Sequence, residues 1–339
     1  MRKIVRTVLL SSMLIISAIG CTPKSEKDDS SSLLLLGALA SANNTGSLGC
    51  QNKTLNWTLR TPPETNGWMS VTFGDNRFVA IAANGTTAAM VSSDGITWTG
   101  HTTSETGSFI SITHGNGLYV TTSPSATNKV MSSPDGANWT DRTAASLNTW
   151  QSVTFGNGTF VAVSTNGTDR VMSSPEGITW TSRNVPLNSW SQVTYGNGIF
   201  VALGASGKVM TSPDGITWTA RTDVETNTWY SVVYGNGQFV AVAGTGTNRV
   251  MTSPDGITWT PRSATEGNTW ISVTYGNGLF VAVSQDGTNR IMTSEDGINW
   301  KAQLAPEQIA WKTITFGNNR FVGVSNNTGS SKIMTASCE

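Results

Sequence analysis

An aromatic residue recurs every 39 to 41 positions between residues 68 and 311. The series consists of Trp68, Phe109, Trp150, Trp190, Trp229, Trp270 and Trp311. A second series runs beside it through Trp57, Trp98, Trp139, Trp180, Trp218, Trp259 and Trp300. Self-similarity at a fixed period of this size is typical of repeat folds, in which each repeat is one supersecondary unit. The period therefore constrains the fold more than any other feature of the chain.

Each unit reads as four short strands. The first strand is W-x-S-V-T-Y, and the G-N-G that follows is a hairpin turn. The second strand is F-V-A-V-S and the third is R-V-M-T-S, followed by a Pro-Asp-Gly turn and a fourth strand, I-T-W-T-x-R. No stretch in the repeats has a helical period. The pattern predicts an all-β fold of four-stranded antiparallel propeller blades, because a solenoid more often uses parallel strands.

The number of units predicts a closed ring. The seventh unit, 311–339, holds only three strands, and the missing fourth strand is TLNWTLR at 54–60, just before the first blade. The two ends of the chain are therefore expected to share a blade, which leaves no open sheet edge. The sequence predicts a seven-bladed β-propeller over residues 50–339, with the last blade closed by the N-terminal strand.

Cysteine positions agree with this closure. Of three cysteines, Cys50 and Cys338 lie one beside each half of the shared blade. In an oxidising compartment they are expected to form a disulfide that fastens the ring. Two free thiols are the alternative.

The repeated phrase of the third turn also has a family resemblance. Ser253-Pro254-Asp255-Gly256-Ile257-Thr258-Trp259 resembles the Asp-box, S-x-D-x-G-x-T-W, of BNR-repeat propellers, the family that includes sialidases, with one residue fewer between Asp and Gly. The resemblance implies a structural brace away from any active site. The residue types agree, because Ser and Asp side chains accept hydrogen bonds from turn amides and Gly takes unusual backbone angles. The phrase is therefore interpreted as a building part.

The N-terminus reads as an export signal. Basic residues precede the apolar run 7–20, which predicts a signal peptide over 1–20. Ala18-Ile19-Gly20-Cys21 resembles a bacterial lipobox, which implies cleavage before Cys21 and lipid attachment to it. An ordinary signal peptide is the alternative. Residues 21–49 are expected to form the lipidated cysteine and a flexible tether, in which Leu33–Ala40 is too short to cross a membrane. The protein is expected to be exported and lipid-anchored to the cell envelope, at the outer membrane. It can face either the cell surface or the periplasm.

Composition excludes several functions. The net charge is zero and only 12% of residues are charged, so no nucleic-acid partner is expected, and the membrane is a partner through the lipid anchor only. Two histidines leave little room for metal or histidine chemistry, and no G-x-S-x-G occurs. No cofactor, metal site or catalytic residue is predicted, and the protein is expected to be a monomer.

Positions that differ between the otherwise similar repeats are the candidates for ligand contact. The residue after each first-strand aromatic varies as Met69, Ile110, Gln151, Ser191, Tyr230, Ile271 and Lys312. Gln151, Tyr230 and Lys312 are predicted to contact a ligand at the channel mouth, with packing variation as the alternative. The connections between second and third strands and between blades vary most, and in propellers they share one face.

The chain is therefore interpreted as a binding or interaction module for protein or glycan, acting through the face with the variable loops. A sialidase-like glycoside hydrolase and a periplasmic assembly scaffold are the alternatives. The hydrolase is less favoured, because the Arg-Ile-Pro motif of sialidases is absent and no blade carries an irregular insertion.

Overall fold

The computed structural model describes residues 49–50 and 54–338. The chain divides into two units, Met1–Ser47 and Leu48–Glu339, and the description below concerns the second. The predicted signal peptide, the lipid-attachment residue Cys21, the segment Leu33–Ala40 and nearly all of the tether lie outside the described residues. Within the described ranges, no helix has the length and apolar character needed to cross a membrane.

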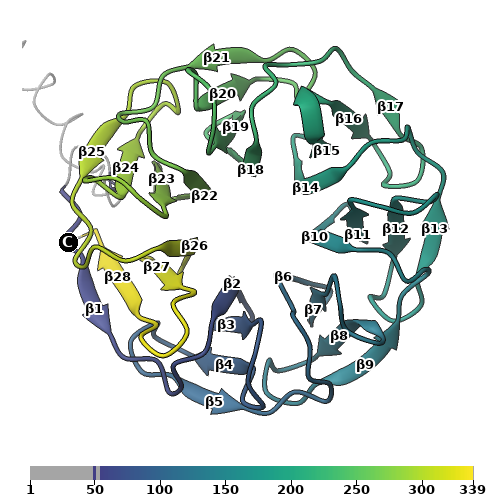
Figure 1. Ribbon diagram of the computed structural model, residues 1–339, viewed down its shortest axis with the longest axis horizontal. Coiled ribbons are helices and arrows are strands. Elements are labelled where there is room, and N and C mark those ends of the chain that lie inside the picture. The colour runs from purple at the N-terminus through teal and green to yellow at the C-terminus, as the bar shows by residue number, and fades with distance from the viewer. Residues whose placement is uncertain (1–48, 51–53, 339) are drawn as a thin grey trace, which may run out of the picture. The chain divides into compact units, whose positions relative to one another are not determined.

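Seven four-stranded antiparallel sheets are arranged radially around a central axis, as Figure 1 shows. In each sheet the strands follow one another from the axis outward in chain order, apart from the outermost strand of the last sheet. The predicted all-β, seven-bladed β-propeller is confirmed.

The strands have the following bounds, from the innermost outward. Blade 1 contains β2 (Trp68–Gly74), β3 (Arg77–Ala82), β4 (Ala89–Ser92) and β5 (Thr99–His101). Blade 2 contains β6 (Ser111–Gly115), β7 (Leu118–Thr122), β8 (Lys129–Ser133) and β9 (Thr140–Thr143). Blade 3 contains β10 (Trp150–Gly156), β11 (Thr159–Ser164), β12 (Val171–Ser174) and β13 (Thr181–Arg183). Blade 4 contains β14 (Trp190–Gly196), β15 (Ile199–Gly204), the 3₁₀ turn η1 (Ala205–Gly207), β16 (Val209–Ser212) and β17 (Thr219–Ala220).

The remaining blades follow the same plan. Blade 5 contains β18 (Trp229–Gly235), β19 (Gln238–Ala243), β20 (Val250–Ser253) and β21 (Thr260–Arg262). Blade 6 contains β22 (Trp270–Gly276), β23 (Leu279–Ser284), β24 (Ile291–Ser294) and β25 (Lys301–Gln303). Blade 7 contains β26 (Trp311–Gly317), β27 (Arg320–Ser325), β28 (Ile333–Ser337) and, from the other end of the chain, β1 (Thr58–Arg60).

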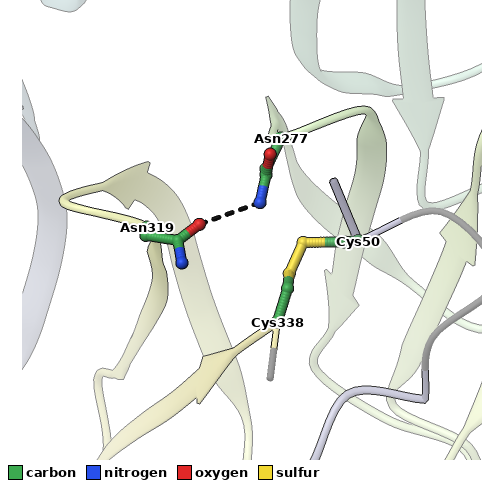
Figure 2. Close-up of a disulfide and its surroundings, with 4 residues drawn as sticks. All are labelled: Cys50, Asn277, Asn319 and Cys338. Atoms are coloured by element: carbon green, nitrogen blue, oxygen red, sulfur yellow. Dashed lines mark hydrogen bonds between the residues drawn. A yellow bond between two sulfur atoms is a disulfide. The ribbon is translucent and has the colours of Figure 1, made fainter. Parts of the chain in front are cut away.

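The ends of the propeller close the ring as predicted. Strand β1 pairs antiparallel with β28, with Thr58 opposite Thr335 and Arg60 opposite Ile333. A disulfide joins Cys50 to Cys338, whose Cα atoms are 5.0 Å apart (Figure 2). The Cys50 amide also donates to the Asn277 carbonyl of blade 6 at 2.8 Å. The N-terminal end of the propeller is therefore held to the last two blades by a strand, a disulfide and a hydrogen bond.

Two predicted strand boundaries differ from the structure. The fourth strands begin only after the tryptophan of the repeated phrase, so β1 covers Thr58–Arg60 and not the whole of 54–60. In four blades the Trp side chain instead belongs to the turn, where its Nε1–H donates to the turn glycine carbonyl, as from Trp98 to Gly95 at 3.1 Å. In blade 2, the inner strand β6 begins at Ser111 and not at Phe109, although the Phe109 ring is buried like the other aromatics of its series.

The core lies between the blades because side chains alternate across each strand. In β3, Phe78 and Ala80 pack with Val322 and Val324 of blade 7, whereas Val79 belongs to the cluster shared with blade 2. Both faces of the second strands are thus buried, which explains their continuous apolar run. Each interface joins the aromatic face of one blade to the valine face of the preceding one.

The glycine that ends each inner strand is required because a side chain there would clash with the next blade. A Cβ atom on Gly156 would lie 2.0 Å from Cγ of Tyr195 on the next blade. The aromatic ring before each hairpin packs on the preceding blade's glycine in this way, so the Tyr-Gly pair of the repeat is a blade-to-blade contact. The hairpin itself has positive φ at both central residues, as at Asn157 (47°) and Gly158 (73°), which is the two-residue type I′ turn.

Candidate functional site

The repeated Ser-Pro-Asp-Gly turns satisfy their own hydrogen bonds. Oγ of Ser253 accepts from the Gly256 amide at 2.8 Å, and Oδ1 of Asp255 accepts from the Ile257 and Thr258 amides at 2.8 Å each. Gly256 has a φ of 71°. The hydrogen bond from the Thr258 amide lowers the pKa of Asp255, with burial opposing it and the Ile257 amide assisting. The side chains are engaged in the turn, as expected of a brace.

Most charged side chains on the rim also have structural partners. Arg249 donates through Nε to the Gly246 carbonyl at 3.1 Å and through Nη1 to the Gly244 carbonyl at 3.0 Å. Glu105 accepts from the Asn128 amide at 3.1 Å and from the Thr127 amide. Arg142, Arg183, Arg221 and Arg262 each donate through Nε to a Ser or Thr hydroxyl of the adjacent strand. These charges shape the loops and outer strands, which leaves few of them free for a ligand.

The variable residues meet at one end of the central channel. Each inner strand begins near the connection from the preceding blade, so its first residues lie at the face that carries these connections and the loops between second and third strands. We call this the variable-loop face. A cavity of about 400 Å³ lies there between the seven inner strands. Figure 1 shows how these strands surround the axis. It is lined by Met69, Ile110, Gln151, Ser191, Tyr230, Ile271 and Lys312 together with the residues that follow them.

A β-bulge places the variable side chains in this cavity. In six inner strands the pairing register shifts between the tryptophan and the residue two positions later, as between Trp311 and Thr313. The residue between them, such as Lys312, has no opposite partner in the ladder, and bulges commonly redirect a side chain in this way. Gln151, Tyr230 and Lys312 therefore line one cavity, and their contact with a ligand stays a prediction.

The residue after the bulge has a structural task in most blades. Oγ of Ser111 accepts from the Val153 amide of the next inner strand at 3.0 Å, and Ser231 bonds the Val273 amide in the same way at 3.1 Å. Ser70, Ser152 and Ser272 make the equivalent bond. Gln192 takes this position in blade 4 and Thr313 in blade 7. The serines therefore hold the ring together and are weak candidates for ligand contact.

Lys312 differs from the other members of the cavity in its charge. Its neighbours around the ring are Ile271 of blade 6 and Met69 of blade 1, both apolar. None of the described residues that line the cavity is a carboxylate, and burial alone lowers the pKa of Lys312. The amine thus lies in a partly desolvated site with no opposing charge.

A cleft between blades 4 and 5 extends the cavity, and sequence reasoning missed it. The loop between β15 and β16 spans 205–208, two residues fewer than the corresponding loops 165–170 and 244–249. A space of about 270 Å³ opens beside it, lined by hydroxyl residues such as Ser189, Ser206 and Thr226 and sharing Ser191 with the channel cavity. The signal was present in the sequence, because the spacing from Trp190 to Trp229 is the shortest of the series, at 39 residues.

Blade 4 also differs in the hydrogen bonds around its shortened loop. In blades 3 and 5, Asn148 and Asn227 donate through Nδ2 to the carbonyls of Asp169 and Asn248, at 2.7 and 2.6 Å. In blade 4 the Gly207 carbonyl, at the equivalent position, accepts from the Val224 amide at 2.9 Å. Among the described residues, the buried Oδ1 of Asn188 has no hydrogen-bond partner. The loop of blade 4 therefore departs from the hydrogen-bonding pattern of blades 3 and 5.

A more apolar cavity of about 380 Å³ lies at the outer edge of blade 5, lined by Met251, Trp259 and Pro261. Its two carboxylates already have partners, because Asp223 pairs with Lys208 at 2.5 Å and Glu225 accepts from Asn248 at 2.7 Å. The channel mouth is the better candidate site, because it combines side chains from all seven blades with an unpaired charge.

The channel mouth differs from the active site of most glycosidases, which use two carboxyl groups flanking the scissile bond. The described residues that line the channel cavity and the cleft between blades 4 and 5 include neither Asp nor Glu. Across the described ranges, no group of three or more His, Cys, Asp or Glu side chains is placed to hold a metal ion.

Comparison with known proteins agrees with this architecture. Residues 193–312 match the family model described as the DUF6242 beta propeller domain. The chain is a β-propeller. No curated protein matches it by sequence. The matched segment runs from inside the inner strand of blade 4 to the start of that of blade 7, so it covers blades 5 and 6 and most of blade 4.

Several solved structures are similar to this propeller. A catalytically inactive virginiamycin B lyase from Staphylococcus aureus, determined with quinupristin, has a TM-score of 0.74 at 13% identity, with 84% of this chain and 99% of that chain covered. YCF48 from Cyanidioschyzon merolae has a TM-score of 0.61 at 14% identity, covering 83% and 98%. A structure of YCF48 bound to D1 peptide has a TM-score of 0.63 at 12% identity, covering 87% and 99%. At these identities the likeness concerns the fold alone, and none of it is direct evidence of catalysis.

Proposed function

We propose that this chain is a lipid-anchored propeller of the cell envelope that binds a protein or glycan ligand through its variable-loop face. The observation that carries the proposal is the channel cavity at that face, where the residues that differ between blades come together. Ligand sites are concave and carry polar groups that orient the ligand, and this cavity presents Gln151, Tyr230 and Lys312 beside the apolar side chains of Met69, Ile110 and Ile271. Among the similar structures, YCF48 was determined with a bound D1 peptide, which makes peptide or protein binding a reasonable use of the fold.

Exposed apolar side chains on the same face support a macromolecular partner. Leu147 and Leu187 lie in the connections that lead into blades 3 and 4 and are 77% and 72% exposed. They flank the inner strands that carry Gln151 and Ser191. In this proposal the two leucines supply apolar contacts to the partner at the edge of the channel mouth.

The domain organisation is part of the proposal. We assign residues 1–20 to a signal peptide, 21–49 to the lipidated Cys21 and a tether, and 50–339 to the propeller. The disulfide supports export, because such bonds persist mainly in oxidising compartments. The outer membrane is the proposed location, and the propeller can face either the cell surface or the periplasm.

Replacing Cys21 tests the anchor. We expect Cys21→Ser to abolish incorporation of a labelled fatty acid and to move the protein from the membrane fraction to the soluble fraction. The physical reason is that the acyl chains supply the membrane affinity, at about 0.8 kcal/mol per buried CH₂. Cys50→Ser/Cys338→Ser is the control and should keep the label. Label retained by Cys21→Ser would overturn the proposed anchor.

Matched substitutions on the two faces test the binding function. The full mature chain in mild detergent would be screened on peptide and glycan arrays, and the probes it binds would then be titrated with two variants. Leu147→Ser/Leu187→Ser changes the variable-loop face, and Ile257→Ser/Ile298→Ser changes exposed residues of the third turns on the opposite face. We expect the leucine pair to weaken binding by about tenfold or more, since each buried side chain contributes about 1.5–3 kcal/mol.

The isoleucine pair should leave the affinity unchanged. Loss of binding in the isoleucine pair alone, or no binding on either array, would contradict the proposed function. If protease digestion of intact cells spares the protein and lysis exposes it, the partner is sought in the periplasm, as the assembly-scaffold alternative requires.

A further inference from the structure

None of the described residues that line the channel cavity offers the amine of Lys312 an opposite charge. A buried or half-buried cation is costly unless an opposite charge or hydrogen-bond acceptors satisfy it. Lys312 lines the channel cavity between Ile271 and Met69, and the described residues of that cavity include no carboxylate. Burial lowers the pKa of the Lys312 amine.

Packing does not explain a lysine at this position. The equivalent bulge residue is Met69 in blade 1 and Ile271 in blade 6, so the fold accepts an apolar side chain at this position. In contrast, the rim cations have partners on the protein, such as Lys129, whose Nζ donates to the Pro124 carbonyl at 2.7 Å. A charge that the fold neither requires nor compensates indicates an anion from outside.

The cavity also restricts the kind of anion. One ammonium group neutralises one negative charge, which suits a carboxylate better than a phosphate dianion, whose sites usually gather several donors or an arginine fork. Gln151 and Tyr230 add neutral hydrogen-bonding groups from other sides of the ring. Most of the other lining residues carry hydroxyl or amide groups, but Met69 and Ile271 flank Lys312 around the ring, and these apolar side chains favour an apolar body next to the carboxylate.

We propose that the channel mouth binds a single carboxylate carried on an apolar body, with Lys312 as its ion-pair partner. This assignment rests on the proposed binding function and specifies the ligand chemistry of the same face. The carboxylate comes either from a small free acid or from the end of a longer chain. A chain would continue through the cleft between blades 4 and 5, which shares Ser191 with the cavity and is lined by hydroxyl groups suited to amide hydrogen bonds.

Calorimetric titration of the full mature chain tests the proposal. The probes are hexanoate with hexanamide, glucuronate, and the tripeptide N-acetyl-Gly-Gly-Leu with its C-terminal amide. We expect each apolar acid to bind about tenfold or more tightly than its amide, because a hydrogen bond to a charged group exceeds a neutral one by roughly that factor. Glucuronate should bind more weakly than hexanoate.

Lys312→Met should remove the preference for acid over amide. It should also fold, because methionine occupies this position in blade 1. Lys301→Met is the matched control, since Lys301 is exposed on the outer strand β25, and it should bind like the wild type. Lys312→Arg keeps the charge and should keep part of the preference. Equal affinity for acid and amide, an acid preference that survives in Lys312→Met, or no saturable acid binding at millimolar concentration would overturn the proposal.

A third variant separates the two sources of carboxylate. Inserting two residues into the loop 205–208 restores the length found in other blades and should fill the cleft. If the natural ligand is the end of a chain, the insertion weakens the tripeptide and not hexanoate; if it is a small acid, both keep their affinity. Should no acid bind while the leucine pair still weakens array binding, the carboxylate assignment is wrong and the proposed function stands. If no acid binds and the leucine pair also leaves array binding unchanged, both the carboxylate assignment and the proposed function are wrong.

Discussion

Replacing both ring-closing cysteines, as in Cys50→Ala/Cys338→Ala, is expected to lower the free energy of unfolding by roughly 5 kcal/mol. The bridge spans 288 positions of the sequence, so in the unfolded chain it closes a very long loop and removes much conformational entropy. Strand β1 pairs with β28 over only three residues, so the disulfide is a large part of what fastens the ends. Urea unfolding followed by tryptophan fluorescence measures the loss.

The reductant provides the control for this experiment. Wild-type protein should lose stability in dithiothreitol, whereas the double variant should unfold at the same urea concentration with and without it. Equal unfolding midpoints for wild type and variant, with thiol titration showing the bridge formed in the wild type, would mean that strand pairing and blade packing alone hold the ring.

Truncating one inner-strand tryptophan should have the next largest effect. We expect Trp270→Ala to cost about 3–5 kcal/mol, because the side chain is fully buried and packs with Val240 and Val242 of the preceding blade. The substitution leaves a cavity at the interface of blades 5 and 6. It also removes the Nε1–H donor to the Glu266 carbonyl, a bond of 3.1 Å.

Trp270→Phe is the matched control, because blade 2 already uses Phe109 at this position and buries it. This variant should lose only about 1 kcal/mol, mainly from the missing hydrogen bond. Urea midpoints of the two variants measure the difference. Similar costs for both substitutions would mean that the hydrogen bond to the connecting loop, and not the filled volume, stabilises the interface.

The turns were the easiest part to predict from the sequence. Asn157-Gly158 and the Ser253–Gly256 turn are local structures, set by residues that tolerate positive φ or accept hydrogen bonds from nearby amides. Strand ends were harder, because the tryptophan of the phrase has the alternation of a strand but bonds back to its own turn. No local preference distinguishes these two uses of the same residue.

The candidate site was predicted only in part. Gln151, Tyr230 and Lys312 were identified because they break the repeat, and the structure places all three on one cavity. The cleft at Ser191 was missed, since a loop shortened by two residues matters only through the space it leaves against the next blade. The sequence also did not indicate that rim charges such as Arg142 and Glu105 are engaged in hydrogen bonds, because their partners lie on another strand or loop.

The sequence by itself determined the number of blades, the shared last blade and the turn types, because these follow from a period near 41 residues, a missing strand and local backbone preferences. Only the tertiary structure decided which side chains meet at the axis. Residues about 41 positions apart come together there only after the ring has closed, and a register shift in the inner strands then places Lys312 and its counterparts in the channel. The unpaired charge of that lysine depends on neighbours from other blades, which no local pattern specifies.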